Sequence, residues 1–151
     1  MASPVLTHYN SREARSHFAD LMREVVRDGR PVVIAPRDES ASVMLARDLL
    51  LDLLDPYAPH VELIPEEEGG FTIWIEELRA TAHGDSLQAA QEMIAREAFD
   101  EVYHFLALWP RFKHTARRGD FPYVFRLALA ETLEEMRTLI FTRFDALAAR
   151  G

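Results

Sequence analysis

The sequence predicts an α+β protein: a small β-α-β-β unit at the N-terminus, then a β-β-β-α unit that runs into C-terminal helices. Short β-branched stretches alternate with longer stretches whose apolar residues recur at helical spacing. Two prolines within residues 55–60 separate the two series, which predicts a linker there. The formal charge is also unevenly distributed along the chain. Residues 1–50 hold 7 basic and 7 acidic residues, residues 51–101 hold 2 basic and 13 acidic residues, and residues 102–151 hold 8 basic and 5 acidic residues. We therefore expect four segments: residues 1–54, 55–60, 61–109 and 110–151.

The composition excludes several classes of protein. The 151 residues include no cysteine, which removes disulfides, thiolate nucleophiles and Cys-ligated zinc. No apolar run approaches the roughly 18 residues of a membrane span, and the first residues lack the apolar core of a signal peptide, so we expect a cytoplasmic protein with no membrane partner. A net charge of −8 argues against a nucleic-acid coat over the whole surface but allows a local basic edge.

The N-terminal segment predicts a complete small unit. Residues 4–7 predict a strand, and Ser11 is a suitable N-cap for the helix that follows. This helix ends at Asp28-Gly29, because glycine can adopt the left-handed C′ conformation. Its apolar face comprises Ala14, Phe18, Leu21, Met22, Val25 and Val26. Two strands of a hairpin and a short helix follow at Val32–Ile34, at Ala41–Ala46 and from Asp48. About 50 residues bury little surface, so this unit should dimerise or pack against the rest of the chain.

Three arginines of this unit are candidate nucleic-acid contacts. Arg12 and Arg15 lie in the first turn of the predicted helix, where main-chain N–H groups also favour a phosphate, and Arg37 lies on the hairpin turn. Arginine at such positions can bind phosphates or contact guanine bidentately. The alternative is that these are solvated surface residues, paired with Glu13 or Asp38.

The order and spacing of four segments resemble the N-terminal half of the Phd/YefM antitoxins. They are the stretch Tyr9–Arg15, the apolar helix, Arg30–Ile34 and Ser42–Leu45, and together they cover residues 4 to about 54. The resemblance implies a dimeric operator-binding domain whose helix start and hairpin turn face DNA. At the positions of this sequence that match the family's pattern, the resemblance implies DNA contacts from Asn10, Ser11, Arg12 and Arg15. Arg37 follows by one residue the position at which the family often has arginine.

The middle segment predicts three strands and a long helix. The strands are expected at Val61–Ile64, Phe71–Ile75 and Thr81–His83. Phe71, Ile73 and Ile75 alternate with Thr72 and Trp74, so one face of the second strand should be buried. Asp85 is the expected N-cap of a helix that contains no Gly or Pro until Pro110.

This segment also resembles the body of the HicB antitoxins, over residues 62–98. The likeness rests on the stretches Pro65–Thr72, Glu77-Leu78 and His83–Ala90. It implies a degenerate ribonuclease-H-like fold with no expected activity. Independently of the resemblance, the turn residues Glu66–Glu68 could bind a metal or serve as acid and base, although adjacent carboxylates on a turn are more often solvent-facing charge.

The last segment predicts a basic loop and an amphipathic helix. The loop, residues 110–122, could bind nucleic acid or neutralise the acidic middle; its basic residues are Arg111, Lys113, His114, Arg117 and Arg118. From Tyr123 to Arg150 there is no Gly or Pro, and an apolar stripe recurs at helical spacing. This stripe could pack on the chain's own sheet or lie in a groove of a partner protein. In the two resembled families C-terminal segments commonly neutralise the toxin, so the resemblance implies a toxin as that partner. The candidate toxin-binding residues are Phe125, Leu129, Leu133, Met136, Ile140 and Phe144.

These observations lead to one functional hypothesis. The six histidines form no metal-binding pattern, and no P-loop or nucleophile elbow is present, so we expect no enzyme, no metal and no cofactor. We expect the antitoxin of a type II toxin–antitoxin system, which neutralises a toxin such as a basic ribonuclease of the RelE or HicA kind and represses its own operator as a homodimer or higher oligomer. The alternatives are a stand-alone repressor or structural dimer without a toxin, and a nuclease that uses Glu66–Glu68.

Overall fold

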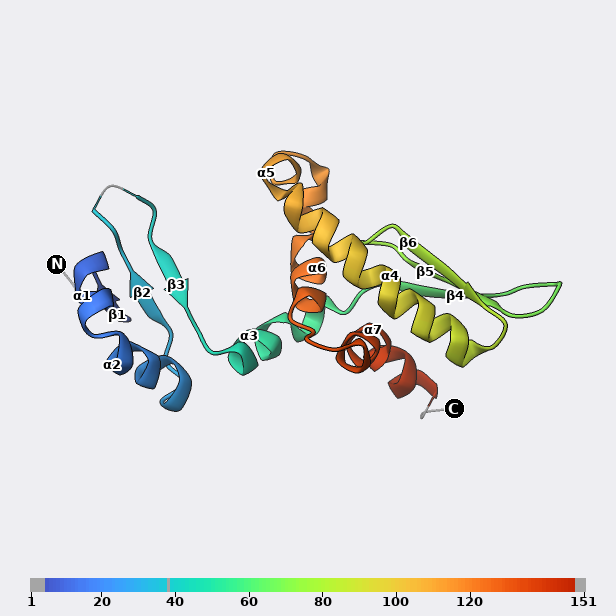
Figure 1. The fold of residues 1–151 in the computed structure, drawn as a ribbon, viewed down its shortest axis with the longest axis horizontal. Coiled ribbons are helices and arrows are strands. Elements are labelled where there is room, and N and C mark those ends of the chain that lie inside the picture. The colour runs from blue at the N-terminus through green and yellow to red at the C-terminus, as the bar shows by residue number, and fades with distance from the viewer. Residues whose placement is uncertain (1–4, 38, 149–151) are drawn as a thin grey trace. The chain divides into compact units, whose positions relative to one another are not determined.

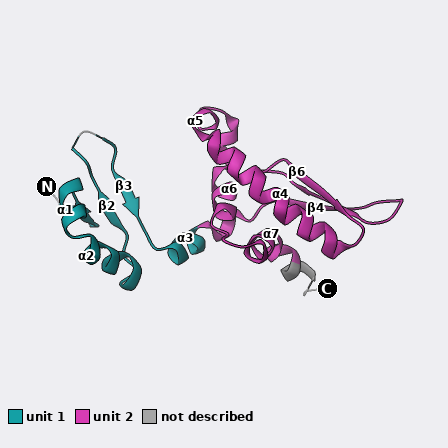
Figure 2. Ribbon diagram, in the orientation of Figure 1, with its two compact units in different colours: residues 1–53 teal, residues 54–151 magenta. Residues whose placement is uncertain are grey.

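The computed structural model describes residues 5–37 and 39–148 (Figure 1). The chain divides into two compact units, Met1–Leu53 and Leu54–Gly151 (Figure 2). Each unit contains a three-stranded sheet and several helices, so the predicted α+β class is confirmed. Among the described helices, none combines the length and the apolar character needed to cross a membrane.

The first unit follows the predicted β-α-β-β order. Its strands β1, β2 and β3 are Thr7–Tyr9, Val32–Ile34 and Ser42–Met44. β1 and β2 are parallel and β2 and β3 are antiparallel, so a helical crossover must join the first two strands. The crossover consists of α1, α2 and the π-helical turn η1, at Ser11–Ser16, Phe18–Met22 and Arg23–Arg27. A further helix, α3, spans Arg47–Leu54. The strand expected at residues 4–7 thus begins at Thr7, and residue 4 lies outside the described residues.

The N-cap of α1 is Asn10 rather than the predicted Ser11. The Asn10 side-chain oxygen accepts hydrogen bonds from the main-chain N–H groups of Arg12 and Glu13 at 3.0 and 2.9 Å. The Glu13 carboxylate in turn accepts from the Asn10 N–H at 2.9 Å. This reciprocal pair is a capping box, which places the cap one residue earlier than the serine.

The core of the first unit is small. Leu21, Val25 and Val32 are its buried apolar side chains among the residues that the structure describes, and they are surrounded by the partly buried Tyr9, Ala14, Met22, Ile34 and Met44. Phe18 and Val26, which the sequence places on the same helical face, are exposed. The predicted single helix is interrupted at His17 and changes to π-helical spacing at Arg23, so one 3.6-residue stripe does not hold along its length.

The second unit is built on an antiparallel sheet with one long helix against it. Strands β4, β5 and β6 are Val61–Pro65, Phe71–Ile75 and Ala80–Gly84, in that spatial order. Helix α4, Leu87–Ala107, lies along β6 and β5 (Figure 1). Its N-cap is Ser86, whose hydroxyl accepts from the Ala89 N–H at 3.1 Å, rather than the predicted Asp85.

Glycine is required at one position of the β4–β5 turn. Gly70 has φ of +88°, and a Cβ there would lie 2.5 Å from the carbonyl oxygen of Gly84 on β6. Only glycine combines this left-handed conformation with so close an approach of two strands. The turn that carries Glu66–Glu68 therefore leads into a close approach of Gly70 to the end of β6.

The C-terminal third contains more helix than the sequence predicts. Within the expected basic loop 110–122, the chain forms α5 at Trp109–Phe112, the 3-10 helix η3 at Ala116–Asp120 and the start of α6, Phe121–Ala128. Both Pro110 and Pro122 lie in the first turns of helices, where proline costs no hydrogen bond. The loop prediction is therefore wrong for most of these residues.

The single helix expected from Tyr123 is also divided. α6 ends at Ala128 and α7 spans Leu133–Ala148, while residues 149–151 lie outside the described part of the chain. The break occurs without Gly or Pro because Thr132 caps α7: its hydroxyl accepts from the Glu135 N–H at 3.1 Å, and the Glu135 carboxylate accepts from the Glu131 N–H at 2.7 Å.

The core of the second unit lies between the sheet, α4 and the last two helices. It includes Ile94 and Ala98 of α4 together with Ile73 and Ile75 of β5, whose burial follows the alternation predicted for that strand. The predicted linker 55–60 begins with a 3-10 helix, η2, at Asp55–Tyr57, and the next two residues, Ala58 and Pro59, are buried.

Candidate functional site

The fold brings four of the five predicted DNA-binding residues to one surface concavity of the first unit. Asn10, Ser11 and Arg12 come from the start of α1, and Arg37 follows β2; together they line this hollow. β1 pairs with β2 in parallel, so the end of β1 and the end of β2 lie at the same edge of the sheet. Two guanidinium groups that are 25 residues apart in sequence therefore border one depression.

Arg15 does not line this concavity but lies one helical turn after Arg12 and is exposed. Of the alternative ion pairs, Glu13 is engaged by the Asn10 N–H, and Asp38 lies outside the described residues. The N–H groups of Arg12 and Glu13 are occupied by the Asn10 side chain, so they are not free to bind a phosphate. The charged groups that line this hollow are therefore the side chains of Arg12 and Arg37.

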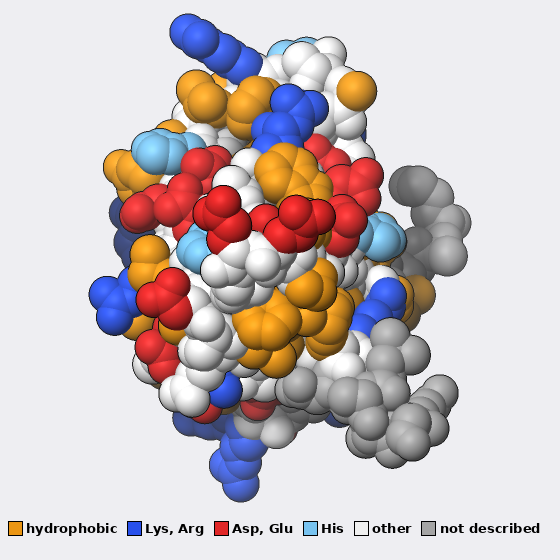
Figure 3. Space-filling model, turned by 90° about the vertical axis from the view of Figure 1, so that its right-hand side faces the viewer, with side chains coloured by type: hydrophobic (Ala, Val, Ile, Leu, Met, Phe, Trp, Pro, Cys, Tyr) orange, Lys and Arg blue, Asp and Glu red, His pale blue; other side chains and the backbone are white. Residues whose placement is uncertain are grey.

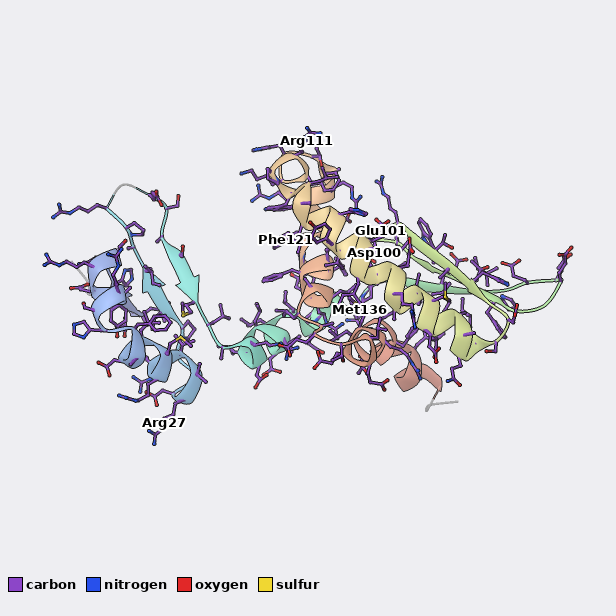
Figure 4. The ribbon with its side chains drawn as sticks, viewed as in Figure 1. Arg27, Asp100, Glu101, Arg111, Phe121 and Met136 are labelled. Atoms are coloured by element: carbon purple, nitrogen blue, oxygen red, sulfur yellow. The ribbon has the colours of Figure 1, made fainter. Side chains whose placement is uncertain are left out.

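The predicted toxin-binding stripe is split between core and surface. Met136 (labelled in Figure 4) and Ile140, on α7, are 0% and 2% exposed. Phe144 is partly buried against the same core. Leu133, by contrast, is 43% exposed. The alternative that the sequence left open, packing on the chain's own core, therefore holds for Met136 and Ile140. The two remaining members, Phe125 and Leu129, are half-buried.

One arginine of the predicted basic loop has a structural role. The Arg117 guanidinium lies 5.0 Å from the centre of the Phe105 ring and 4.9 Å from that of Phe112. It also donates to the Glu77 carbonyl oxygen and to the Asp120 carboxylate, both at 2.8 Å. Arg117 thus joins η3 to α4 and to the β5–β6 connection, whereas Arg111, Lys113, His114 and Arg118 are exposed.

The candidate acidic site of the sequence lies on the surface. Glu66, Glu67 and Glu68 are exposed and border a hollow with His83 and Asp85. Figure 3 shows acidic side chains gathered over this end of the second unit. The arrangement creates a locally negative surface, as expected for solvent-facing charge.

A second ionisable cluster was missed by the sequence analysis. The Glu77 carboxylate is buried, accepts from the His60 N–H at 3.0 Å and contacts the His60 Nδ1. This hydrogen bond, followed by the attraction of the carboxylate, raises the pKa of His60 above its usual value. Together with the exposed Glu76 these residues could hold a metal ion. Their proximity depends on the pairing of β4 with β5, which local sequence patterns do not reveal.

A buried arginine was also missed. Arg126 of α6 lies in the core, and its Nη1 donates to the Leu139 carbonyl oxygen at 2.7 Å. Burial lowers the pKa of Arg126, partly offset by the negative charge of Asp55. The residue holds α6 against α7 rather than contributing to a surface site.

Comparisons with known proteins give one family and one solved structure. A family model named PHD_like, described as an antitoxin of toxin–antitoxin, RelE / RelB, TA system, matches residues 5–142. A crystal structure at 1.80 Å resolution, described as the antitoxin part of a toxin/antitoxin system from Syntrophomonas wolfei subsp. wolfei, shares the fold with a TM-score of 0.74. That protein is 21% identical over 89% of this chain and 96% of its own length. No curated protein matches the chain.

Proposed function

The chain belongs to this antitoxin family, and we propose that it is the antitoxin of a type II toxin–antitoxin system, binding and neutralising a protein toxin in the cytoplasm. The match of the family model to residues 5–142 carries this proposal, because it spans both units. The proposed activity is binding alone, with no reaction catalysed by this chain.

We assign operator binding to the first unit. Arg12 and Arg37 border one concavity with Asn10 and Ser11, and Arg15 lies one turn further along α1. Arginine side chains at a helix start and at an adjoining turn can bind phosphates of one DNA strand or contact a guanine edge. This arrangement supports the Phd/YefM-like assignment and autorepression of the operon.

We also propose that the first unit acts as a homodimer. Its three buried apolar residues form a small core, while Phe18, Val26 and Val43 remain exposed on it. A second copy that covered such side chains would add the burial that a unit of about 50 residues lacks on its own. A dimer would also present two arginine clusters to two halves of an operator.

The second unit suits a basic toxin, and we propose a ribonuclease of the RelE or HicA kind. A protein that holds RNA must expose positive charge. The acidic residues of the second unit, most of which lie in the segment 61–109 that resembles HicB, would complement that charge. Complementary charge accelerates association of the two proteins and suppresses binding of acidic competitors.

Two experiments test the two activities separately. The chain is co-expressed with the protein encoded by the adjacent reading frame; retention of that protein through purification, and relief of its toxicity, are expected. A stand-alone repressor would instead bind DNA and retain no such partner, which would refute toxin neutralisation.

For DNA, a gel shift uses the fragment upstream of the operon. Arg15→Ala is expected to weaken binding by about 1–3 kcal/mol if the side chain reads a base edge. Arg27→Ala is the matched control, since Arg27 is an exposed arginine of η1, away from the concavity (Figure 4). Unchanged binding by the Arg12→Ala, Arg15→Ala double variant would refute the assignment of these residues.

A further inference from the structure

We propose that the uncovered face of the β4–β5–β6 sheet, together with the acidic β4–β5 turn, is a docking surface for a basic protein. The inference rests on the proposed antitoxin function and identifies where the cognate toxin binds. It differs from the stripe of the sequence analysis, because Met136 and Ile140 of that stripe are buried in the chain's own core.

Strand register defines the two faces of the sheet. Successive residues of a strand point to opposite faces, so the buried Ile73 and Ile75 mark the side that meets the core. The opposite side carries two cross-strand rows: Glu62, Trp74 and Thr81, then Ile64, Thr72 and His83. None of these six described side chains is buried, whereas Ile73 and Ile75 on the core side of β5 are buried.

Helix α4 lies against the core side of this sheet and leaves the other side open. Trp74 occupies the middle of the open side, on the central strand between Glu62 and Thr81, and is half-buried. Ile64, on the edge strand β4, is 38% exposed. A large aromatic residue at the centre of an uncovered surface is the type of side chain that contributes most to protein interfaces.

The rim of this face is strongly acidic. Residues 61–85 include seven acidic residues and one basic residue, Arg79. Glu62 lies on the face, Glu66–Glu68 extend from one end of it, and Asp85 borders the same hollow as that turn. An apolar centre with an acidic rim therefore favours a partner that combines exposed apolar residues with Lys and Arg.

Charge also selects among possible occupants. A second copy bound face to face would bring two acidic rims together, and like charges opposed at an interface cost affinity. Nucleic acid would be repelled by the same carboxylates. The face itself measures about 16 Å by 14 Å, from five residues along each strand and three strands across. This is less than the roughly 800 Å² that one partner buries in a standard interface, so the acidic turn must contribute to binding.

The first test places a bulky charge on the face, next to its central Trp74. The full chain is titrated with the protein encoded by the adjacent reading frame, by calorimetry. Thr81 is exposed beside Trp74, and Thr81→Arg is expected to weaken binding by about tenfold or more. Met93→Arg adds the same side chain to the exposed side of α4 and is expected to leave affinity within about twofold. Melting curves of both variants check that the second unit remains folded.

The second test reverses charge on the rim. Glu66→Arg with Glu68→Arg is expected to slow association by about tenfold, with a smaller loss at high salt. The matched pair, Glu97→Arg with Asp100→Arg, changes the net charge equally on the exposed side of α4 (Figure 4) and should have a much smaller effect.

The outcomes separate this inference from the proposed function. If the wild-type chain does not bind the neighbouring protein, the antitoxin proposal itself fails. If the wild-type chain binds and the face and rim variants bind equally well, the docking surface is refuted and the antitoxin proposal stands. Two further results would overturn the inference. One is that Thr81→Arg changes the oligomeric state of the free chain, and the other is that the bound partner carries no excess of positive charge.

Discussion

Truncation of Met136 tests whether the last helix is part of the core. Met136 is fully buried in the core of the second unit, where α7 packs against α4 and α6, so Met136→Ala removes three heavy atoms from a closed site. Comparable Met→Ala changes in protein cores cost about 2–5 kcal/mol, because transfer and cavity terms add. Leu133→Ala is the control: Leu133 begins the same helix but is 43% exposed, and we expect a cost below about 1 kcal/mol.

The assay can isolate the second unit. Both tryptophans of the chain, Trp74 and Trp109, belong to that unit, so their fluorescence during urea unfolding follows it alone. A loss of about 3 kcal/mol would lower the urea midpoint by about 1–3 M at a typical slope. If Met136→Ala and Leu133→Ala had equal, small effects, α7 would not be core, and a toxin-binding role for the whole stripe would be restored.

Three further changes probe other features of the second unit. Hydrogen bonding to Glu77 raises the folded-state pKa of His60, so this stabilisation is complete below about pH 6.5 and is lost as pH rises through the raised pKa. The difference in unfolding free energy between wild type and His60→Ala should therefore narrow from about pH 6.5 upward. Arg117→Met should destabilise the unit by about 2–3 kcal/mol in urea unfolding, because two hydrogen bonds and the contacts with two rings are lost. Gly70→Ala should lower the melting temperature, because φ is +88° and the new Cβ would meet the Gly84 oxygen.

Each of these changes has its own control and contrary result. A pH-independent difference for His60→Ala would show that the contact with Glu77 does not persist in solution. Arg118→Met serves as the control for Arg117, since Arg118 is exposed, and equal effects of the two would contradict the clamp between rings. Gly119→Ala has open space around its Cβ and should be nearly neutral; an equally neutral Gly70→Ala would contradict the turn geometry.

Elements with strong local signals could be predicted from sequence. Val32–Ile34 and Phe71–Ile75 have the bounds that the β-branched and alternating patterns predict, because burial of one face acts on each residue locally. The long helix α4 likewise runs through the stretch that contains no Gly or Pro and ends at Ala107, shortly before Pro110.

Other features depend on competition between neighbours or on tertiary packing. The break before α7 is set by hydrogen bonds of Thr132 and Glu135, which no glycine or proline marks in the sequence. The helical turns around Pro110 were missed because proline was taken as a terminator, whereas it is also favoured in a first turn.

For the candidate sites too, residue types could be predicted from sequence, but the distances between residues could not. Arg12 and Arg37 could be singled out as basic residues at helix and turn positions, but their common concavity results from the parallel pairing of β1 and β2. The contact between His60 and Glu77 spans 17 residues and follows from the register of β4 and β5. Sequence patterns give residue types and faces, whereas such distances depend on how strands pair.

The small core of the first unit has a consequence for turnover of the protein. With three buried apolar side chains, this unit gains little free energy from burial, so its open form should be populated more than that of the second unit. Any ligand that binds only the closed form adds RT ln(1 + [L]/Kd), or about 2.7 kcal/mol at a hundredfold excess over Kd. Occupied molecules would therefore resist proteases that cleave the N-terminal segment, and the lifetime of the chain would report how much of it is bound.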